Sequence, residues 1–269
     1  MKISEKIHFI SSWIKDHVNN MPSQAKSLVI GISGGIDSSV SSTLSAMTGL
    51  KTIVLSMPIK QKFSQHNLSL KHQEWLVKNF KNVEAHTVNL DQLFDSFELS
   101  LSKFKNVESH LIILDNLFKS FKVSLSEFDN EHGLANSRAR LRMTTLYQVA
   151  ASNKGIVVGT GNKIEDFGVG FYTKYGDGGV DISPIADCNK TDVWEMGKEL
   201  KILQEIIDAA PTDGLWADDR TDEDQLGLKY SELEEAMNNP NSPNRKKYEK
   251  IRKLNLHKME PIPVCKIPN

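Results

Sequence analysis

The residues with the clearest chemical potential form the loop Ser33-Gly34-Gly35-Ile36-Asp37-Ser38, between an apolar run at 28–32 and a helical pattern. Such an apolar run predicts a buried parallel strand. Glycines at a strand-to-helix turn let backbone N–H groups surround an anion, and the helix N-terminus adds its positive dipole end. Asp37 suits a divalent metal that the phosphates also contact. The loop lacks the GK[ST] ending of an ordinary P-loop. We therefore predict a nucleotide-phosphate site, with a tight turn capped by an aspartate as the alternative.

Further polar side chains follow the run at 155–160, which predicts another buried strand. Thr160 and Glu165 come at its carboxyl end, where open parallel sheets bind their ligands. A Gly-Asp-Gly-Gly sequence follows; it is a turn in its simplest form, but it carries more charge than a turn requires. The charged residues around it are Lys174, Asp177 and Asp181.

Three arginines, at 138, 140 and 142, alternate along a predicted helix at 132–153. At 100° per residue, the first and third share a face, and Arg140 lies nearly opposite them on the side of Met143. A run of arginines is usually a solvated face. Because Arg140 shares its side with apolar residues, we expect it to point into a site.

The remaining pattern predicts the elements that position these groups. Two β-branched runs separated by one helix, at 28–32 and 52–57, indicate a βαβ unit with parallel strands. A short strand is expected at 182–185. The other predicted helices cover 3–18, 68–80, 193–203, 228–237 and 245–254. We expect an α/β fold, a doubly wound, mainly parallel sheet flanked by helices, in a single domain spanning 1–269. The polar connection at 206–227 is typical of a lid or a disordered insert.

One segment is duplicated. Residues 80–103 recur as 104–127, with 15 of 24 positions identical, and each copy reads as a strand followed by a helix. Two copies are too few for a solenoid, so we interpret them as a tandemly duplicated βα unit at 80–127. The second strand is more continuously apolar, which suits a strand covered on both faces. We therefore predict that the second copy takes the third-strand position, with the first at the sheet edge or outside the core.

Composition narrows the functional classes. The 269 residues carry a net charge of −1, which gives no electrostatic footprint for nucleic acid. No run is long and apolar enough for a membrane span, and the N-terminus lacks a secretory apolar region. Two cysteines without a CxxC pattern disfavour a disulfide framework or a structural zinc site. We expect a cytoplasmic enzyme.

The loop resembles the pyrophosphate-binding loop of N-type ATP pyrophosphatases, and the whole chain resembles the ammonia-dependent NAD synthetases. The matching blocks are GISGGIDSS, ANSRARLRM, VVGTGNKIED, GFYTKYGDGGVDISP, NKTDV, APTDGLW and a closing HK. The resemblance implies an ATP site made of Gly31, Ile32, Ser33, Gly34, Gly35, Ile36, Asp37, Ser38, Thr160, Lys190 and Thr212. It implies magnesium on Asp37 and Glu165, and deamido-NAD on Arg140, Lys174, Asp181, His257 and Lys258. Asp177 matches an aspartate that lies beside the reacting nicotinate in the family. The catalytic residues that the resemblance implies are Asp177, Lys190 and Thr212.

The implied reaction is an ATP-dependent amidation. ATP converts the nicotinate carboxylate of deamido-NAD into an acyl-adenylate and releases pyrophosphate; ammonia then displaces AMP. Mg²⁺, Lys190 and the loop amides would neutralise the developing charge, and Asp177 would attract ammonium and take its proton.

The resemblance also implies a homodimer, to which the apolar stripe of the first helix could contribute, unless it packs on its own sheet. Only thirty residues precede the loop, so we expect ammonium and not glutamine as nitrogen donor. The alternatives are a GMP-synthetase-like amidation domain and a non-catalytic ATP-binding module.

Overall fold

The computed structural model describes residues 1–61, 63–105, 130–212, 214–216 and 220–267. Its sheet has four parallel strands in the order β3-β2-β1-β4. The strands are β1 (Ser27–Gly31), β2 (Thr52–Ser56), β3 (Val83–Thr87) and β4 (Gly155–Val157). The predicted strand at 182–185 is reduced to one parallel bridge between Val158 and Ile182.

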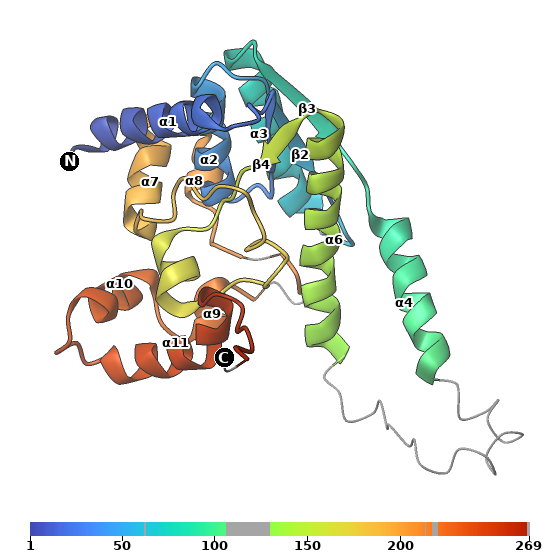
Figure 1. Ribbon diagram of the computed structural model, residues 1–269. Helices are drawn as coiled ribbons and strands as arrows, with labels where there is room; N and C mark the ends of the chain where they lie inside the picture. The colour runs from blue at the N-terminus through green and yellow to red at the C-terminus, as the bar shows by residue number, and fades with distance from the viewer. Residues whose placement is uncertain (62, 106–129, 213, 217–219, 268–269) are drawn as a thin grey trace, which may run out of the picture.

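Helices cover both faces of this sheet (Figure 1). One face carries α1 (Ile3–Asn20), α2 (Ile36–Met47), α3 (Phe63–Asn79) and α7 (Lys190–Glu199), and the other carries α4 (Asp91–Lys105) and α6 (Asn130–Ser152). Side chains of β1 alternate between the two layers: Leu28 and Ile30 pack toward α1 and α2, and Val29 packs toward α6. This confirms the predicted doubly wound α/β fold and explains why the strands are continuously apolar.

The apolar stripe of α1 packs on its own protein. Ile7, Ile10 and Ile14 are buried in the same cluster as β1 and α2. The stripe is therefore explained without a partner.

A smaller layer lies beside the sheet. It contains the π-helical turn η3 (Lys163–Val169) and the helices α9 (Asp222–Leu226), α10 (Tyr230–Asn238) and α11 (Arg245–Met259), which share one apolar cluster. The short helix α8 (Gln204–Ile207) follows α7. Within the described residues, no helix combines the length and hydropathy needed to cross a bilayer.

The duplicated unit corrects one prediction. The first copy supplies β3, which pairs with β2 through Thr52 and Val83 and lies at the edge of the described sheet. The edge placement agrees with our prediction, but the first copy also takes the position beside β2 that we had assigned to the second. The second copy lies almost wholly at 106–129, outside the described residues.

Differences in charge between the two copies favour the first copy beside β2. Lys60, in the loop that follows β2, forms ion pairs of 2.6 Å with both Asp95 and Glu98 on α4 of the first copy. The equivalent residues of the second copy are Lys119 and Lys122. The acidic first copy therefore complements Lys60, whereas the second would repel it.

Candidate active site

The functional side chains gather where the strand order reverses. The chain runs outward from β1 to β2 and β3, and then returns to place β4 on the other side of β1. At such a switch point the loops leaving two neighbouring strands diverge and form a crevice. A cavity of about 240 Å³ lies there. The predicted site residues that line it are Gly31, Ile32, Ser33, Gly35, Ile36, Asp37, Ser38, Thr160, Glu165, Asp177, Lys190 and Thr212.

The loop after β1 is held by its own hydroxyl groups. Ser33 and Ser38 lie 3.0 Å apart through their Oγ atoms, and Ser38 donates to the carbonyl of Gly35. Gly34 adopts a φ of 93°, a backbone conformation that favours glycine. The turn therefore leads directly into α2. The first backbone N–H groups of a helix lack intrahelical partners, so they can bind an anion.

Lys190 stands between the two predicted metal-binding carboxylates. Its Nζ lies 2.6 Å from Oδ2 of Asp37 and 2.9 Å from Oε1 of Glu165, and the side chain is 1% exposed. Burial disfavours the charged ammonium, but the two carboxylates outweigh that effect and raise the pKa of Lys190. Burial likewise opposes ionisation of Glu165, but Lys190 and Tyr230 lower the pKa of that carboxyl group. The site therefore holds one fixed positive charge beside the phosphate loop.

Asn162 joins the two loops. Its Oδ1 accepts from the backbone N–H groups of Ile164 and Glu165, which begins η3, and its Nδ2 donates to Oδ1 of Asp37 at 3.0 Å. The turn ends at Gly170, whose φ of 65° suits glycine and where a Cβ atom would lie 2.7 Å from Asn255. Single π-helical turns are uncommon and often occur at functional sites, and the sequence pattern gave no sign of this one.

Tyr230 is among the residues at the site that sequence reasoning missed. Tyr230, at the start of α10, donates its hydroxyl to Glu165 at 2.5 Å and lies 3.1 Å from Oδ2 of Asp222. Burial, followed by the charges of Glu165 and Asp222, raises the pKa of the phenol and keeps it protonated. An apolar spacing on α10 predicts only that Tyr230 is a core residue, so no sequence signal distinguishes it.

Asp177 and Asp166 add carboxyl groups to the cavity wall. Asp177 Oδ1 accepts from the backbone N–H of Thr173 at 2.9 Å. Burial, together with Glu165, Asp177 and Asp37, raises the pKa of Asp166 to about 8. Asp166 directly follows Glu165 in the sequence, and that adjacency could have drawn attention to it.

The predicted deamido-NAD residues lie beside the cavity and not on its described lining. Arg140 is exposed, and its Nε donates to the carbonyl of Lys174 at 3.3 Å. Lys174 in turn donates to the carbonyl of His257. The arginine on the cavity wall is instead Arg142, which donates to Met57.

The other two members of this set already have protein partners. Lys258 Nζ lies 2.8 Å from the carbonyls of Gly170 and Tyr172. Asp181 Oδ2 accepts from the N–H of Val157 at 2.7 Å. Arg140, Lys174 and His257 thus form one hydrogen-bonded group. Asp181, which follows the Gly-Asp-Gly-Gly turn, instead binds the end of β4 through its side chain.

A family model described as NAD synthase matches residues 6–267. This chain belongs to the NAD synthase family. It is 34% identical to the NH(3)-dependent NAD(+) synthetase of Alkaliphilus metalliredigens over 98% of this chain and 99% of that protein. It is 34% identical to the enzyme of the same name from Carboxydothermus hydrogenoformans, over 87% of this chain and 84% of the other. A solved structure of NMN synthetase from Francisella tularensis superposes with a TM-score of 0.81 and 29% identity, over 100% of this chain and 99% of that one.

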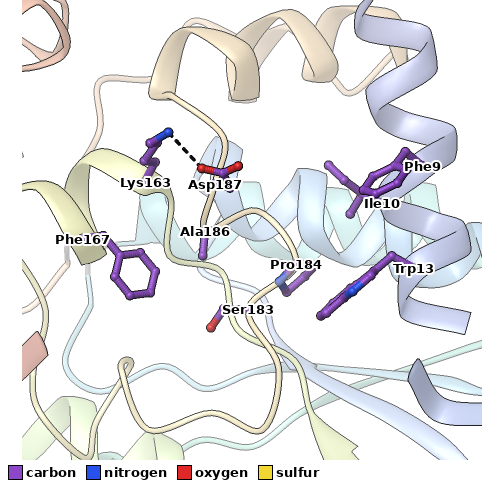
Figure 2. Close-up of a pocket in the computed structure, with 9 residues that line it drawn as sticks. All are labelled: Phe9, Ile10, Trp13, Lys163, Phe167, Ser183, Pro184, Ala186 and Asp187. Atoms are coloured by element: carbon purple, nitrogen blue, oxygen red, sulfur yellow. Dashed lines mark ion pairs between the residues drawn. The ribbon is translucent and has the colours of Figure 1, made fainter. Parts of the chain in front are cut away.

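This NAD synthase family member has a second hollow, between α1 and the segments that carry η3 and residues 183–187. It measures about 370 Å³, and Figure 2 shows aromatic side chains of Phe9, Trp13 and Phe167 facing it, with the ion pair of Lys163 and Asp187 at its margin. None of the predicted site residues is among its described lining. It is therefore separate from the phosphate site.

Proposed function

We propose that this protein catalyses the ATP-dependent amidation of deamido-NAD to NAD, with ammonia as nitrogen donor and AMP and pyrophosphate as further products. The observation that carries the proposal is the cavity between β1 and β4, where the phosphate loop, Lys190 and Thr160 meet in a chain of the NAD synthase family. A carboxylate is a poor acylating group until its oxygen becomes a leaving group. Attack of the nicotinate carboxylate on the α-phosphate of ATP achieves this, and ammonia then attacks the carbonyl of the adenylate.

The residues of the cavity suit the charge that develops in the first step. The free N–H groups at the start of α2 and the ammonium of Lys190 lie where pyrophosphate would leave. Lys190 is buried and held on two sides, so little reorganisation is needed when the phosphates bind. Thr160 and Thr212 line the same cavity and complete the proposed ATP site.

Magnesium fits the same place. Among the described residues no cluster of three or more His, Cys, Asp and Glu side chains could hold a metal. Mg²⁺, however, is commonly bound by one or two carboxylates together with substrate phosphates, and Asp37 and Glu165 both line the cavity. When bound, the ion would polarise the phosphate oxygens and neutralise their charge. Asp37 and Glu165 meanwhile hold Lys190 in place through their ion pairs.

The substrate acid would be bound outside the phosphate loop. We assign this role to the group formed by Arg140, Lys174 and His257, with Lys258 and Asp181 at its border. Asp177 lies on the cavity wall, and its carboxylate would attract ammonium and accept a proton from it.

One assay tests this function directly. The purified protein, Mg-ATP and deamido-NAD are incubated with ammonium chloride or with glutamine, and NAD and pyrophosphate are both measured. We expect multiple turnovers to both products with ammonium, and with glutamine alone no NAD and at most one equivalent of pyrophosphate per enzyme from the first step. A GMP-synthetase-like enzyme or a non-catalytic ATP-binding module would release no pyrophosphate in response to deamido-NAD.

A second substrate is favoured by one observation. The Francisella tularensis protein, an NMN synthetase, matches this fold over the whole chain at a TM-score of 0.81. The alternative function is therefore amidation of nicotinate mononucleotide to NMN by the same adenylation chemistry. The ratio of kcat/KM for deamido-NAD and nicotinate mononucleotide decides between them, and a ratio above ten in either direction identifies the substrate.

We also propose that the protein is a homodimer, as the family resemblance implies, and that the hollow in Figure 2 belongs to its interface. Phe9 is 61% exposed and Phe167 49% exposed, which is unusual for large apolar side chains on one surface. Light scattering should show a dimer that Phe9→Glu converts to a monomer. A dimer that survives this substitution would place the interface elsewhere, and a wild-type monomer would exclude the homodimer.

The cytoplasm is the proposed location, since ATP and pyridine nucleotides are made and used there.

A further inference from the structure

Tyr230 combines deep burial with polar contacts on both sides of its hydroxyl group. The side chain is 1% exposed. Lys190 Nζ lies 4.6 Å from the centre of its ring, and Trp194 packs edge-on at 5.9 Å. A buried phenol requires a hydrogen-bond partner for its O–H. The ring would fill this space equally well without the oxygen, so the hydroxyl group needs its own explanation.

The hydroxyl lies against a carboxylate of the proposed ATP and metal site. It is 2.5 Å from Oε1 of Glu165, the same oxygen that accepts from Lys190 at 2.9 Å. A phenol carries a single proton, and the shorter of its two contacts directs that proton to Glu165 rather than to Asp222 at 3.1 Å. Two donors from different elements thus fix the orientation of one carboxylate.

The second contact leads to another part of the site. Asp222 begins α9, and its backbone N–H donates to the carbonyl of Pro211 at 3.1 Å. Pro211 precedes Thr212, which lines the cavity. The backbone N–H of Tyr230 also bonds Glu223 at 2.9 Å. Tyr230 therefore lies between Glu165 on η3 and the chain that carries Thr212.

We propose that Tyr230 is a positioning residue for the amidation reaction, whose hydroxyl holds the Glu165 carboxylate in its working orientation. This inference rests on the proposed function of the site. Without the hydroxyl, Glu165 keeps its charge and its ion pair with Lys190, but one of the two donors that orient it is lost. Small misplacements of groups at a reacting centre reduce the rate much more than they reduce binding of a distant part of the substrate.

The test uses Tyr230→Phe, which keeps the ring and removes only the oxygen. We expect kcat to fall about tenfold, with the KM for the acid substrate unchanged within about twofold. Without turnover, calorimetry should show weaker binding of the magnesium complex of α,β-methylene-ATP. Tyr248→Phe is the matched control: Tyr248 is 3% exposed in the same apolar cluster, and its hydroxyl has no hydrogen bond among the described residues. Equal losses in the two variants, or wild-type kcat and analogue binding in Tyr230→Phe, would overturn the proposal.

A double-mutant cycle tests the connection to Glu165. Glu165→Gln should lower kcat by itself, and adding Tyr230→Phe to it should cause little further loss, because the hydroxyl acts through that carboxylate. Multiplicative losses would show that the two residues act separately and would overturn the proposal. If the wild-type protein amidated neither acid, the proposed function would fail, whereas analogue binding would still decide whether Tyr230 positions Glu165.

Discussion

The Nζ atom of Lys190 lies 2.6 Å from Oδ2 of Asp37, although 153 residues separate the two in the chain. The pair unites the first residue of α7 with the first turn of α2, directly beside the phosphate loop. Because Lys190 is buried, its charge is tolerated only with its carboxylate partners in place. The same contact therefore serves the fold and the binding of phosphate.

Replacing the ammonium should abolish turnover. Lys190→Met keeps most of the side-chain volume but leaves Asp37 and Glu165 facing each other without a cation. We expect NAD formation to fall at least about 100-fold, as for loss of a preorganised charged group. Lys163→Met is the control, because Lys163 pairs with Asp187 at the surface and such exposed pairs contribute little. Near-normal turnover in Lys190→Met would remove this residue from the reaction.

Removing a carboxylate should affect both activity and stability. Sequence reasoning suggested that Asp37→Ala and Glu165→Ala would leave the fold intact, because both residues end loops. The structure changes this expectation, since either variant leaves the buried Lys190 with one partner. We expect loss of turnover and a decrease of about 3 kcal/mol in the free energy of unfolding, measured by urea denaturation. Unchanged stability would show that the Lys190 charge is compensated by other groups.

His72 should make stability depend on pH. It is fully buried against Ser42, and burial lowers its pKa to about 4. The folded protein thus keeps His72 neutral, whereas the unfolded chain takes up a proton below pH 6.5. The contribution of His72 should be constant above pH 6.5 and destabilise the fold by on the order of 3 kcal/mol toward pH 4. The urea midpoint of His72→Gln relative to that of the wild type should therefore rise as the pH falls toward 4, and the exposed His8→Gln should behave as wild type. Parallel curves for all three proteins would contradict the assignment.

The two cysteines should differ in reactivity. Burial, and then the charge of Asp192, raise the pKa of Cys188 to about 11, whereas Cys265 is exposed. Because the thiolate is the reactive form, a thiol reagent at pH 8 should modify one cysteine quickly. Cys265→Ser should abolish that fast phase, and denaturant should restore reaction at Cys188. A fast phase that remains in Cys265→Ser would show that Cys188 is accessible.

Deletion of residues 80–103 tests the duplication. It joins Asn79 to Phe104 and restores the local sequence, so the second copy can supply the strand beside β2. Two strands, β2 and β1, separate that strand from β4, so we expect an active enzyme. Lys119 and Lys122 would then replace Asp95 and Glu98 opposite Lys60, which should lower stability by about 1 kcal/mol.

A charge-restored deletion variant provides the control. Adding Lys119→Asp and Lys122→Glu should return the lost stability, because the acidic partners of Lys60 are regained. An insoluble deletion protein, with or without these changes, would show that both copies are built into the fold.

Much of the site followed from the sequence because its elements are encoded locally. Continuous β-branched runs predicted buried parallel strands, and the glycine-rich turn after the first of them predicted the phosphate loop, which lines the cavity. Parallel strands end at one edge of a sheet, so the proximity of Thr160 and Glu165 to that loop could also be anticipated.

Only the tertiary structure determines which side chains from distant segments contact each other. Tyr230 and Arg142 reach the site only because η3, α10 and α6 pack around the ends of β1 and β4. The first repeat copy forms ion pairs with a residue outside the repeat, Lys60, which the pattern of the repeat does not indicate. Local sequence specifies helices, strands and turns, since their hydrogen bonds and side-chain spacing are local. Which buried hydroxyl meets which carboxylate depends on the packing of segments far apart in the chain, and the local pattern carries no record of that geometry.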